Sequence, residues 1–315
     1  MTVQGKPPER RLAARAAELA QQVPLRAAGF IVTLYGDVVV PRGGEVWIGN
    51  IISACALVGI SETLVRTAVS RLVAAGQLEG RRQGRRSFYR LTEAASAEFA
   101  EAARIIYGPQ RQPDWRFVWL PEDGAEVAMA QLERSGYARL KPQLAIGPDS
   151  APLPAGALGF AARPEGATEL LRDFAAAHFD LQGHAAAYRD FASRFALLDA
   201  SRPTAARDGD AALALRLLMV HAWRQALLRD PRLPKAALPA AWPASPARAV
   251  FARSYLALSD AADSHVAASF ESVAGPLRRE TASVRARLKA LQEIEAETAK
   301  PAKPMGAPKD EPLTP

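Results

Sequence analysis

Hydrophobic residues recur at helical spacing in three successive stretches near the start of the chain. Residues 25–40 carry dense apolar side chains directly after Pro24, and proline is common in the first turn of a helix. Residues 47–58 repeat the pattern and stop at Gly59, which suits the position just after a helix. A third run covers residues 61–75. The pattern predicts three helices joined by short turns.

The third stretch divides its side chains between two faces. At about 100° per residue, one face collects the apolar side chains of Leu64, Val65, Ala68, Val69 and Leu72. The opposite face collects Thr63, Arg66, Thr67 and Ser70. Ser61 suits the N-cap position. An apolar face opposite a face of arginine and short polar groups is typical of a helix that enters a DNA groove.

Two short alternating stretches follow, residues 78–82 and 86–91, joined across Gln83 and Gly84. Their pattern predicts a β-hairpin. The tip carries four arginines: Arg81, Arg82, Arg85 and Arg86. Three helices followed by a basic hairpin is the order of a winged helix-turn-helix. We expect the third helix to read a major groove and the hairpin arginines to hold phosphates or reach a minor groove.

The middle of the chain mixes strands and helices. A helix is predicted at residues 91–106 and a linker at 111–114. Strand-like segments follow at 115–120, at 138–146, which holds one strand or two, and at 157–161. Helical segments follow at 126–135 and 168–179. This order is close to βαββαβ and predicts a small ferredoxin-like domain.

The last third of the chain is helical in pattern. Helices are predicted at residues 188–198, 210–228, 246–259, 260–270 and 277–298, with a proline-rich connector at 229–243. The expected fold class is α+β, mainly α. The expected parts are a mobile arm (1–22), a winged-helix DNA-binding domain (23–110), a ferredoxin-like domain (111–195), a helical C-terminal domain (196–298) and a disordered tail (299–315).

The charge distribution supports a nucleic-acid partner. Among 315 residues, 40 are basic and 33 acidic, and the net charge is +7. Seven arginines and two glutamates lie between Ser61 and Arg90, a local excess of +5. A basic patch of this density is the electrostatic footprint of a DNA-binding protein. The predicted DNA contacts are Ser61, Thr63, Arg66, Thr67, Ser70, Arg71, Arg81, Arg82, Arg85 and Arg86.

Several classes of protein are disfavoured. No apolar run approaches the ~20 residues that a membrane-spanning helix needs, and no membrane partner is expected. The single cysteine, Cys55, excludes a disulfide framework within one chain and is expected to be a small buried hydrophobe. The four histidines are scattered, so no metal site is expected. The basic N-terminus lacks the apolar core of a secretory signal, and a cytoplasmic location is expected.

Spaced blocks of residues carry a resemblance to a known family. In the N-terminal third they are residues 30–38, 41–48, 65–72 and 84–91. In the C-terminal third they are residues 217–224, 228–234 and 238–243. In this order they resemble the PaaX family, which comprises repressors of phenylacetic acid degradation genes. Gly29 departs from the family pattern, which usually has serine there, and residues 147–156 match nothing in it.

The resemblance implies a winged-helix reader, a central domain similar to that of Cas2, and a helical C-terminal domain. It also implies a homodimer on a partly palindromic double-stranded operator, released by an effector such as phenylacetyl-CoA. A coenzyme A thioester needs cations for its phosphates and an apolar slot for its acyl group. The C-terminal candidates for these roles are Arg216, His221, Trp223, Arg224, Arg229 and Trp242. The alternative is that these residues only hold helices together.

Two enzymatic alternatives remain open. A Cas2-like domain could be a metal-dependent nuclease, but the strand at 115–120 holds no carboxylate and only Asp114 precedes it. An acyl-CoA-processing enzyme could use His221 as a base, but no nucleophile motif accompanies it. The expectation is therefore a protein that is not an enzyme, with no catalytic residue and no cofactor.

Overall fold

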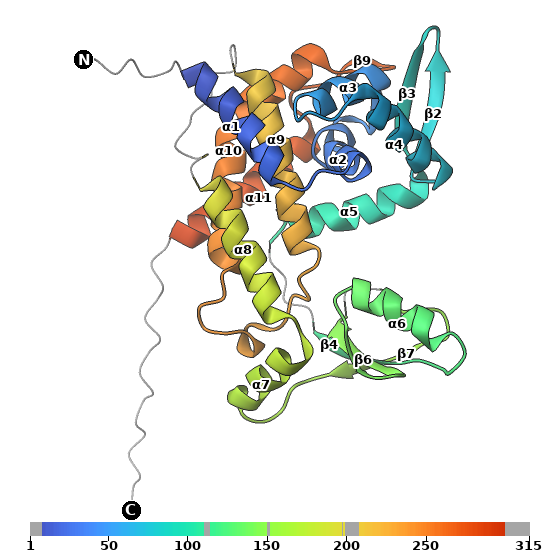
Figure 1. The fold of residues 1–315 in the computed structure, drawn as a ribbon, viewed down its shortest axis with the longest axis vertical. Helices are drawn as coiled ribbons and strands as arrows, with labels where there is room; N and C mark the ends of the chain where they lie inside the picture. The colour runs from blue at the N-terminus through green and yellow to red at the C-terminus, as the bar shows by residue number, and fades with distance from the viewer. Residues whose placement is uncertain (1–7, 110–113, 150–151, 197, 199–207, 300–315) are drawn as a thin grey trace, which may run out of the picture.

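The computed structural model describes residues 8–109, 114–149, 152–196, 198 and 208–299. Its first element is a helix, α1 (Pro8–Gln22), which packs along α9 (Gly209–Leu227) (Figure 1). Leu12, Ala16 and Leu19 recur at helical spacing and are buried. The mobile arm expected at residues 1–22 is therefore wrong from Pro8 onward, because small alanines complete an apolar stripe that looks weak in sequence.

The next elements are three helices and a short strand. Helix α2 (Ala27–Leu34) continues as a π-helical turn, Tyr35–Val39, and a 3-10 turn, Val40–Arg42. Strand β1 (Glu45–Trp47) leads into α3 (Ile48–Ala56), and α4 (Glu62–Ala74) follows. The three predicted helices are confirmed, while the strand β1 was not predicted. Gly59 has φ +82°, the left-handed conformation expected just after a helix.

The predicted hairpin is confirmed as β2 (Leu78–Gln83) and β3 (Arg86–Leu91). Gly84, with φ +60°, makes the turn between them. Strand β1 pairs with the other side of β3, which gives an antiparallel sheet of order β1-β3-β2. We call α2, α3, α4 and this sheet the head.

Helix α5 (Glu93–Tyr107) leads from the head to a second sheet, and Thr92 Oγ1 caps it by accepting from Ala95 N at 3.3 Å. The sheet elements are β4 (Trp115–Trp119), α6 (Ala125–Arg134), β5 (Ala138–Lys141), β6 (Leu144–Pro148), β7 (Leu158–Ala162) and α7 (Thr168–His178). The strand order is β5-β6-β4-β7, and all neighbours are antiparallel.

The element order of this middle part differs from the predicted βαββαβ. The segments lie where the sequence predicts them, with the helix at 168–179 observed as α7 after β7. A βαββαβ order, however, needs a helix between its third and fourth strands, and the described residues between β6 and β7 hold none. Pro152 to Gly156 includes two prolines and a glycine, which disfavour a helix there. Helix α6 packs on one side of the sheet, through Met129 and Leu132, and α7 contributes to a separate cluster on the other.

The remainder is a set of long helices: α8 (Leu181–Phe195), α9, α10 (Ala244–Ser269) and α11 (Ala282–Ala299). The helices predicted at 246–259 and 260–270 form the single helix α10. The expected break at Ser259 and Asp260 does not occur, because neither residue interrupts a helix as proline or glycine would. A 3-10 turn (Lys235–Ala237) and the short pair β8 (Glu271–Ser272) and β9 (Gly275–Pro276) complete the fold. We call α1, α8, α9, α10 and α11 the helical body.

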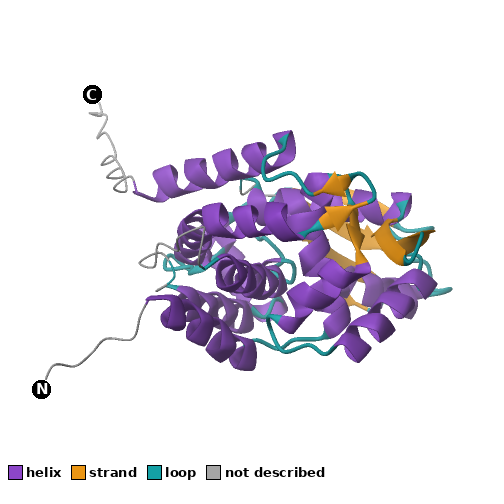
Figure 2. Cartoon of the chain, turned by 90° about the horizontal axis from the view of Figure 1, so that it is seen from above, coloured by secondary structure: helices purple, strands orange, loops and turns teal. Residues whose placement is uncertain are grey.

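One hydrophobic core joins the head to the helical body. It includes Leu34 of α2, Val65 of α4, Leu217 of α9 and Phe251 of α10, all buried. Helix α8 contributes Tyr188 to the same core, so it belongs to the helical body and the boundary expected at residue 195 is displaced. Seen from above, the helices pack side by side and the strands lie at one end (Figure 2). Within the described residues, no helix is long and apolar enough to cross a membrane.

Candidate nucleic-acid interface

Helix α4 is held on the head by one apolar face. Val65, Ala68, Val69 and Leu72 are buried, and α4 contacts α2, α3 and β2. Leu64, expected on the same face, is 57% exposed, whereas the neighbouring Val65 is fully buried. Ser61 precedes the helix in an extended conformation, but its side chain makes no capping hydrogen bond.

The opposite face of α4 is open to solvent. Its exposed polar side chains are the predicted ones: Thr63, Arg66, Thr67, Ser70 and Arg71. Arg66 Nη2 lies 2.7 Å from Glu62 Oε1, one turn earlier, and its side chain is 58% exposed. An exposed pair of this kind is worth little, so the guanidinium can exchange its partner at low cost.

The hairpin carries its four arginines in two different states. Arg81 forms a bidentate ion pair with Glu45 of β1, at 2.6 Å (Nε to Oε1) and 2.9 Å (Nη2 to Oε2). The hydrogen bonds from Arg81 lower the pKa of the Glu45 carboxyl. Arg86 pairs with Glu271 and lies over the ring of Trp47, 4.7 Å from its centroid.

Arg82 and Arg85 are exposed at the tip. Arg82 Nε donates to the carbonyl oxygen of Gly84 at 3.2 Å, and no carboxylate of the described residues pairs with either arginine. Two cations without acidic partners at the end of a projecting hairpin are available for phosphate oxygens.

A groove of about 430 Å³ separates α4 from the hairpin. Its wall combines side chains of both elements with residues of α3 and β3: Ile48, Arg66, Val69, Ser70, Val73, Gly80, Arg81, Arg82, Ser87 and Tyr89. Gly80 is required because a Cβ there would lie 2.8 Å from the Tyr89 ring. The structure thus brings the two predicted halves of the site to one surface.

Sequence reasoning missed the acidic partners of the hairpin arginines. Glu45 lies 36 residues from Arg81, and Glu271 lies 185 residues from Arg86. Glu45 does alternate with Trp47 in a short extended segment, which is the only local signal for β1. Glu271 carries no such signal, because it reaches the hairpin through the packing of the helical body on the head.

The predicted effector residues do not form one site. Arg216 is fully buried, with its Nε 2.9 Å from Asp37 Oδ2 and its Nη1 2.7 Å from Asp263 Oδ1. Trp223 is buried and stacks on Phe251, with ring centroids 5.1 Å apart. The prediction that Arg216 and Trp223 line an effector pocket is therefore wrong, since both belong to the core.

Of the other four candidates, His221 and Arg224 both hydrogen-bond to Thr33, and the remaining two line separate grooves. His221 is buried between Thr33 and Gln225, and burial, aided by the nearby Arg224 cation, lowers its pKa to about 4. Arg224 donates from Nη1 to Thr33 Oγ1 at 2.9 Å and borders a small cavity. Arg229 lines a groove beside α8, and Trp242 lines a larger one beside the proline-rich connector.

Two further candidates have simple surroundings. Cys55 is buried, and burial raises its pKa to about 12, as expected of a small hydrophobe. Asp114 is exposed, and its carbonyl oxygen accepts from Asp149 N at 2.9 Å. The described part of the chain holds no group of three His, Cys, Asp or Glu side chains that could bind a metal ion.

Comparison with known proteins matches both ends of this arrangement. Residues 26–95, which contain α2 to α4 and the hairpin, match the family described as PaaX-like protein. Residues 179–268, which contain α8, α9 and most of α10, match the PaaX-like protein C-terminal domain. The chain is also 30% identical over 277 residues to the Transcriptional repressor PaaX of Escherichia coli (strain K12). The aligned region covers 81% of this chain and 87% of that relative.

Proposed function

Because the chain belongs to the PaaX family, we propose that it is a DNA-binding transcriptional repressor of genes for phenylacetate catabolism. The observation that carries the proposal is the groove in which Arg66 and Ser70 of α4 face Arg81 and Arg82 of the hairpin. The proposed location is the cytoplasm, which holds the DNA in a bacterium such as the source of the matched relative.

In this proposal the head is a winged helix. Its order of α2, β1, α3, α4, β2 and β3, with a sheet of order β1-β3-β2, supports that assignment. Helix α4 enters the major groove and presents Arg66, Thr67 and Ser70 to base edges. Arg82 and Arg85 hold flanking phosphates, where arginine's planar fork suits the oxygens. Ser61, Thr63 and Arg71 are exposed as well and complete the proposed set of contacts at this helix.

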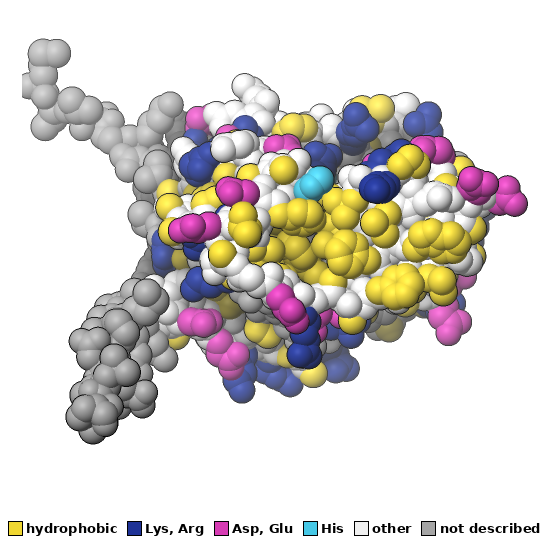
Figure 3. Space-filling model, turned by 90° about the horizontal axis from the view of Figure 1, so that it is seen from below, with side chains coloured by type: hydrophobic (Ala, Val, Ile, Leu, Met, Phe, Trp, Pro, Cys, Tyr) yellow, Lys and Arg dark blue, Asp and Glu magenta, His cyan; other side chains and the backbone are white. Residues whose placement is uncertain are grey.

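We further propose that the repressor is a homodimer that uses an exposed apolar face of the second sheet. Trp119 of β4 is 41% exposed, and Leu158 and Phe160 of the edge strand β7 are each 55% exposed. Trp119 pairs with Leu158 and Phe117 with Phe160, so these side chains share one face. Figure 3 shows hydrophobic side chains gathered on this side of the molecule. A two-fold dimer fits a palindromic operator.

An aryl acyl-CoA such as phenylacetyl-CoA is the proposed effector that weakens operator binding. The best support for a site of that size is a groove of about 980 Å³ beside the proline-rich connector. Arg172, Arg232 and Lys235 line it together with Trp242. Cations beside an aromatic wall suit the phosphates and the apolar end of a coenzyme A thioester. This groove retains Trp242 from the predicted set and replaces the other five residues.

Binding of the full chain to DNA tests the proposal. The DNA upstream of its own gene and of adjacent catabolic genes is titrated by fluorescence anisotropy, with scrambled duplexes of equal composition as controls. We expect one fragment to bind at least about 10³ times more tightly than its scrambled control at physiological salt. Equal affinity for all duplexes, with no dependence on salt, would refute the proposal.

A further inference from the structure

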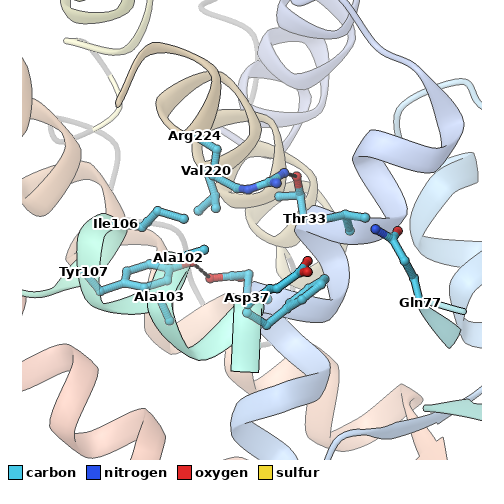
Figure 4. A pocket seen from close by; sticks show the side chains of 13 residues that line it. Thr33, Asp37, Gln77, Ala102, Ala103, Ile106, Tyr107, Val220 and Arg224 are labelled. Carbon is cyan, nitrogen blue, oxygen red and sulfur yellow. Dashed lines mark hydrogen bonds between the residues drawn. The ribbon is translucent and has the colours of Figure 1, made fainter. Parts of the chain in front are cut away.

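A cavity of about 210 Å³ lies where α2, α5 and α9 meet (Figure 4). Most of its wall is apolar, formed by Val32, Phe99, Ala102, Ala103, Ile106 and Val220. Gln77, in the turn between α4 and β2, lies on another side of the cavity than Arg224. Its walls therefore come from both the head and the helical body.

Arg224 supplies the cation of this cavity. Its Nη1 donates to Thr33 Oγ1 at 2.9 Å, and the described residues provide it with no carboxylate. Arg216, eight residues earlier on the same helix, has two. Burial lowers the pKa of Arg224, which reflects the cost of holding its charge away from water. A largely buried guanidinium without an acidic partner is a ready binding group for an anion.

The acidic groups near the cavity do not fill that role. Asp37 borders it, but Arg216 and Arg287 neutralise its carboxylate, and Tyr107 and Tyr255 donate to Oδ1. Burial alone would raise the pKa of Asp37, whereas the two arginines hold it below its ordinary value. Glu98 is exposed at the rim. The uncompensated charge inside the cavity is that of Arg224.

We propose that this cavity binds a small organic monocarboxylate, with its carboxylate on Arg224 and its hydrocarbon part against the apolar wall. The Nη2 and Nε groups of Arg224 are the available donors, because Nη1 already serves Thr33. The rings of Phe99 and Tyr107 suit a flat hydrocarbon group. The volume is below the ~300 Å³ typical of sites for drug-sized ligands, so a whole coenzyme A ester does not fit.

The position of the cavity gives such a ligand a route to the head. A molecule that contacts Gln77 and Val32 on one side and Arg224 on the other favours one arrangement of the head against the helical body. A change in DNA affinity on binding rests on the proposed function. Binding of the carboxylate itself does not, and is measured without DNA.

Isothermal titration of the full chain with phenylacetate, benzoate and butyrate tests the proposal, with phenylacetamide as the neutral analogue of the first. We expect at least one carboxylate to bind with a dissociation constant below about 1 mM. Phenylacetamide is expected to bind at least about tenfold more weakly than phenylacetate, because it cannot form the charge-assisted pair.

Variants separate this site from other binding surfaces. Arg224→Gln is expected to weaken carboxylate binding at least about tenfold, and the control Arg189→Gln, an exposed arginine of α8, is expected to leave it unchanged. Ala103→Leu keeps Arg224 but fills the cavity, and is expected to abolish binding. The proposal is overturned if no carboxylate binds, if binding survives both Arg224→Gln and Ala103→Leu, or if only the thioester phenylacetyl-CoA binds there.

Discussion

Arg216 of α9 and Asp37, in the turn after α2, form an ion pair in the core, with 2.9 Å between Arg216 Nε and Asp37 Oδ2. Arg287 of α11 reaches the same carboxylate, at 3.1 Å from Oδ1. Asp263 of α10 joins Arg216 to Arg42, at 2.7 and 2.6 Å. This network fastens the head to three helices of the body, so the direction of α4 depends on residues far from it in sequence.

The charge count of this network predicts which change is most damaging. Asp37→Asn leaves Arg42, Arg216 and Arg287 with Asp263 alone, and is expected to lower the free energy of unfolding by about 3–5 kcal/mol. Adding Arg216→Met removes one surplus cation and should restore part of this loss. Urea unfolding of the single and double variants measures both effects. Full additivity of the two substitutions would contradict the network.

Protonation of His221 should destabilise the fold. Because burial lowers its pKa from 6.5 to about 4, the folded chain keeps it neutral at pH 7, while the unfolded chain protonates it below pH 6.5. The free energy of unfolding therefore keeps its full value above about pH 6.5, and it falls by up to about 3 kcal/mol as the pH approaches 4. His221→Gln should remove this part of the pH dependence in urea unfolding, and His184→Gln on α8 should not.

The apolar face of the second sheet should control the oligomeric state. Phe160→Glu places a charge in the middle of this face and is expected to convert a dimer into a monomer in sedimentation velocity. Val127→Glu is the matched control, because Val127 is 77% exposed on α6, which packs on the other side of the sheet. A wild-type monomer, or a Phe160→Glu dimer, would contradict the proposed interface.

The tip of the hairpin should contribute affinity without sequence preference. Arg82→Ala and Arg85→Ala are each expected to weaken binding to operator and scrambled DNA alike. Each should also reduce the slope of log affinity against log salt by about 1, because each removes one phosphate contact. Anisotropy titrations at four salt concentrations measure the slope. An unchanged slope in both variants would contradict a contact between the hairpin tip and the DNA phosphates.

The head was largely predictable from sequence because its signals are local. The α4 face, the hairpin and its arginines lie within thirty residues, and helical or alternating spacing is enough to place them. The partners of the arginines were not predictable. In sequence, Arg216 and Arg224 look alike on one helix, yet packing gives Arg216 two carboxylates and leaves Arg224 at a cavity.

Helix α1 and strand β1 were not predicted for the same reason, since each depends on contacts with distant parts of the chain. Helix α1 is stabilised by its contact with α9, about 200 residues away, through the buried side chains of Leu12, Ala16 and Leu19. Strand β1 is three residues long and exists because β3 pairs with it. Tertiary contacts decide both, and no window of the sequence contains them.

The specificity of Arg66 tests the account most directly. Operator and scrambled duplexes are titrated with the wild-type chain, with Arg66→Ala, and with Arg104→Ala, which removes an exposed arginine of α5 outside the groove. If α4 reads base edges, Arg66→Ala should lose about 1–3 kcal/mol on the operator and much less on scrambled DNA, while Arg104→Ala keeps the wild-type ratio. An operator preference that Arg66→Ala leaves intact would contradict the assignment of α4 as the recognition helix.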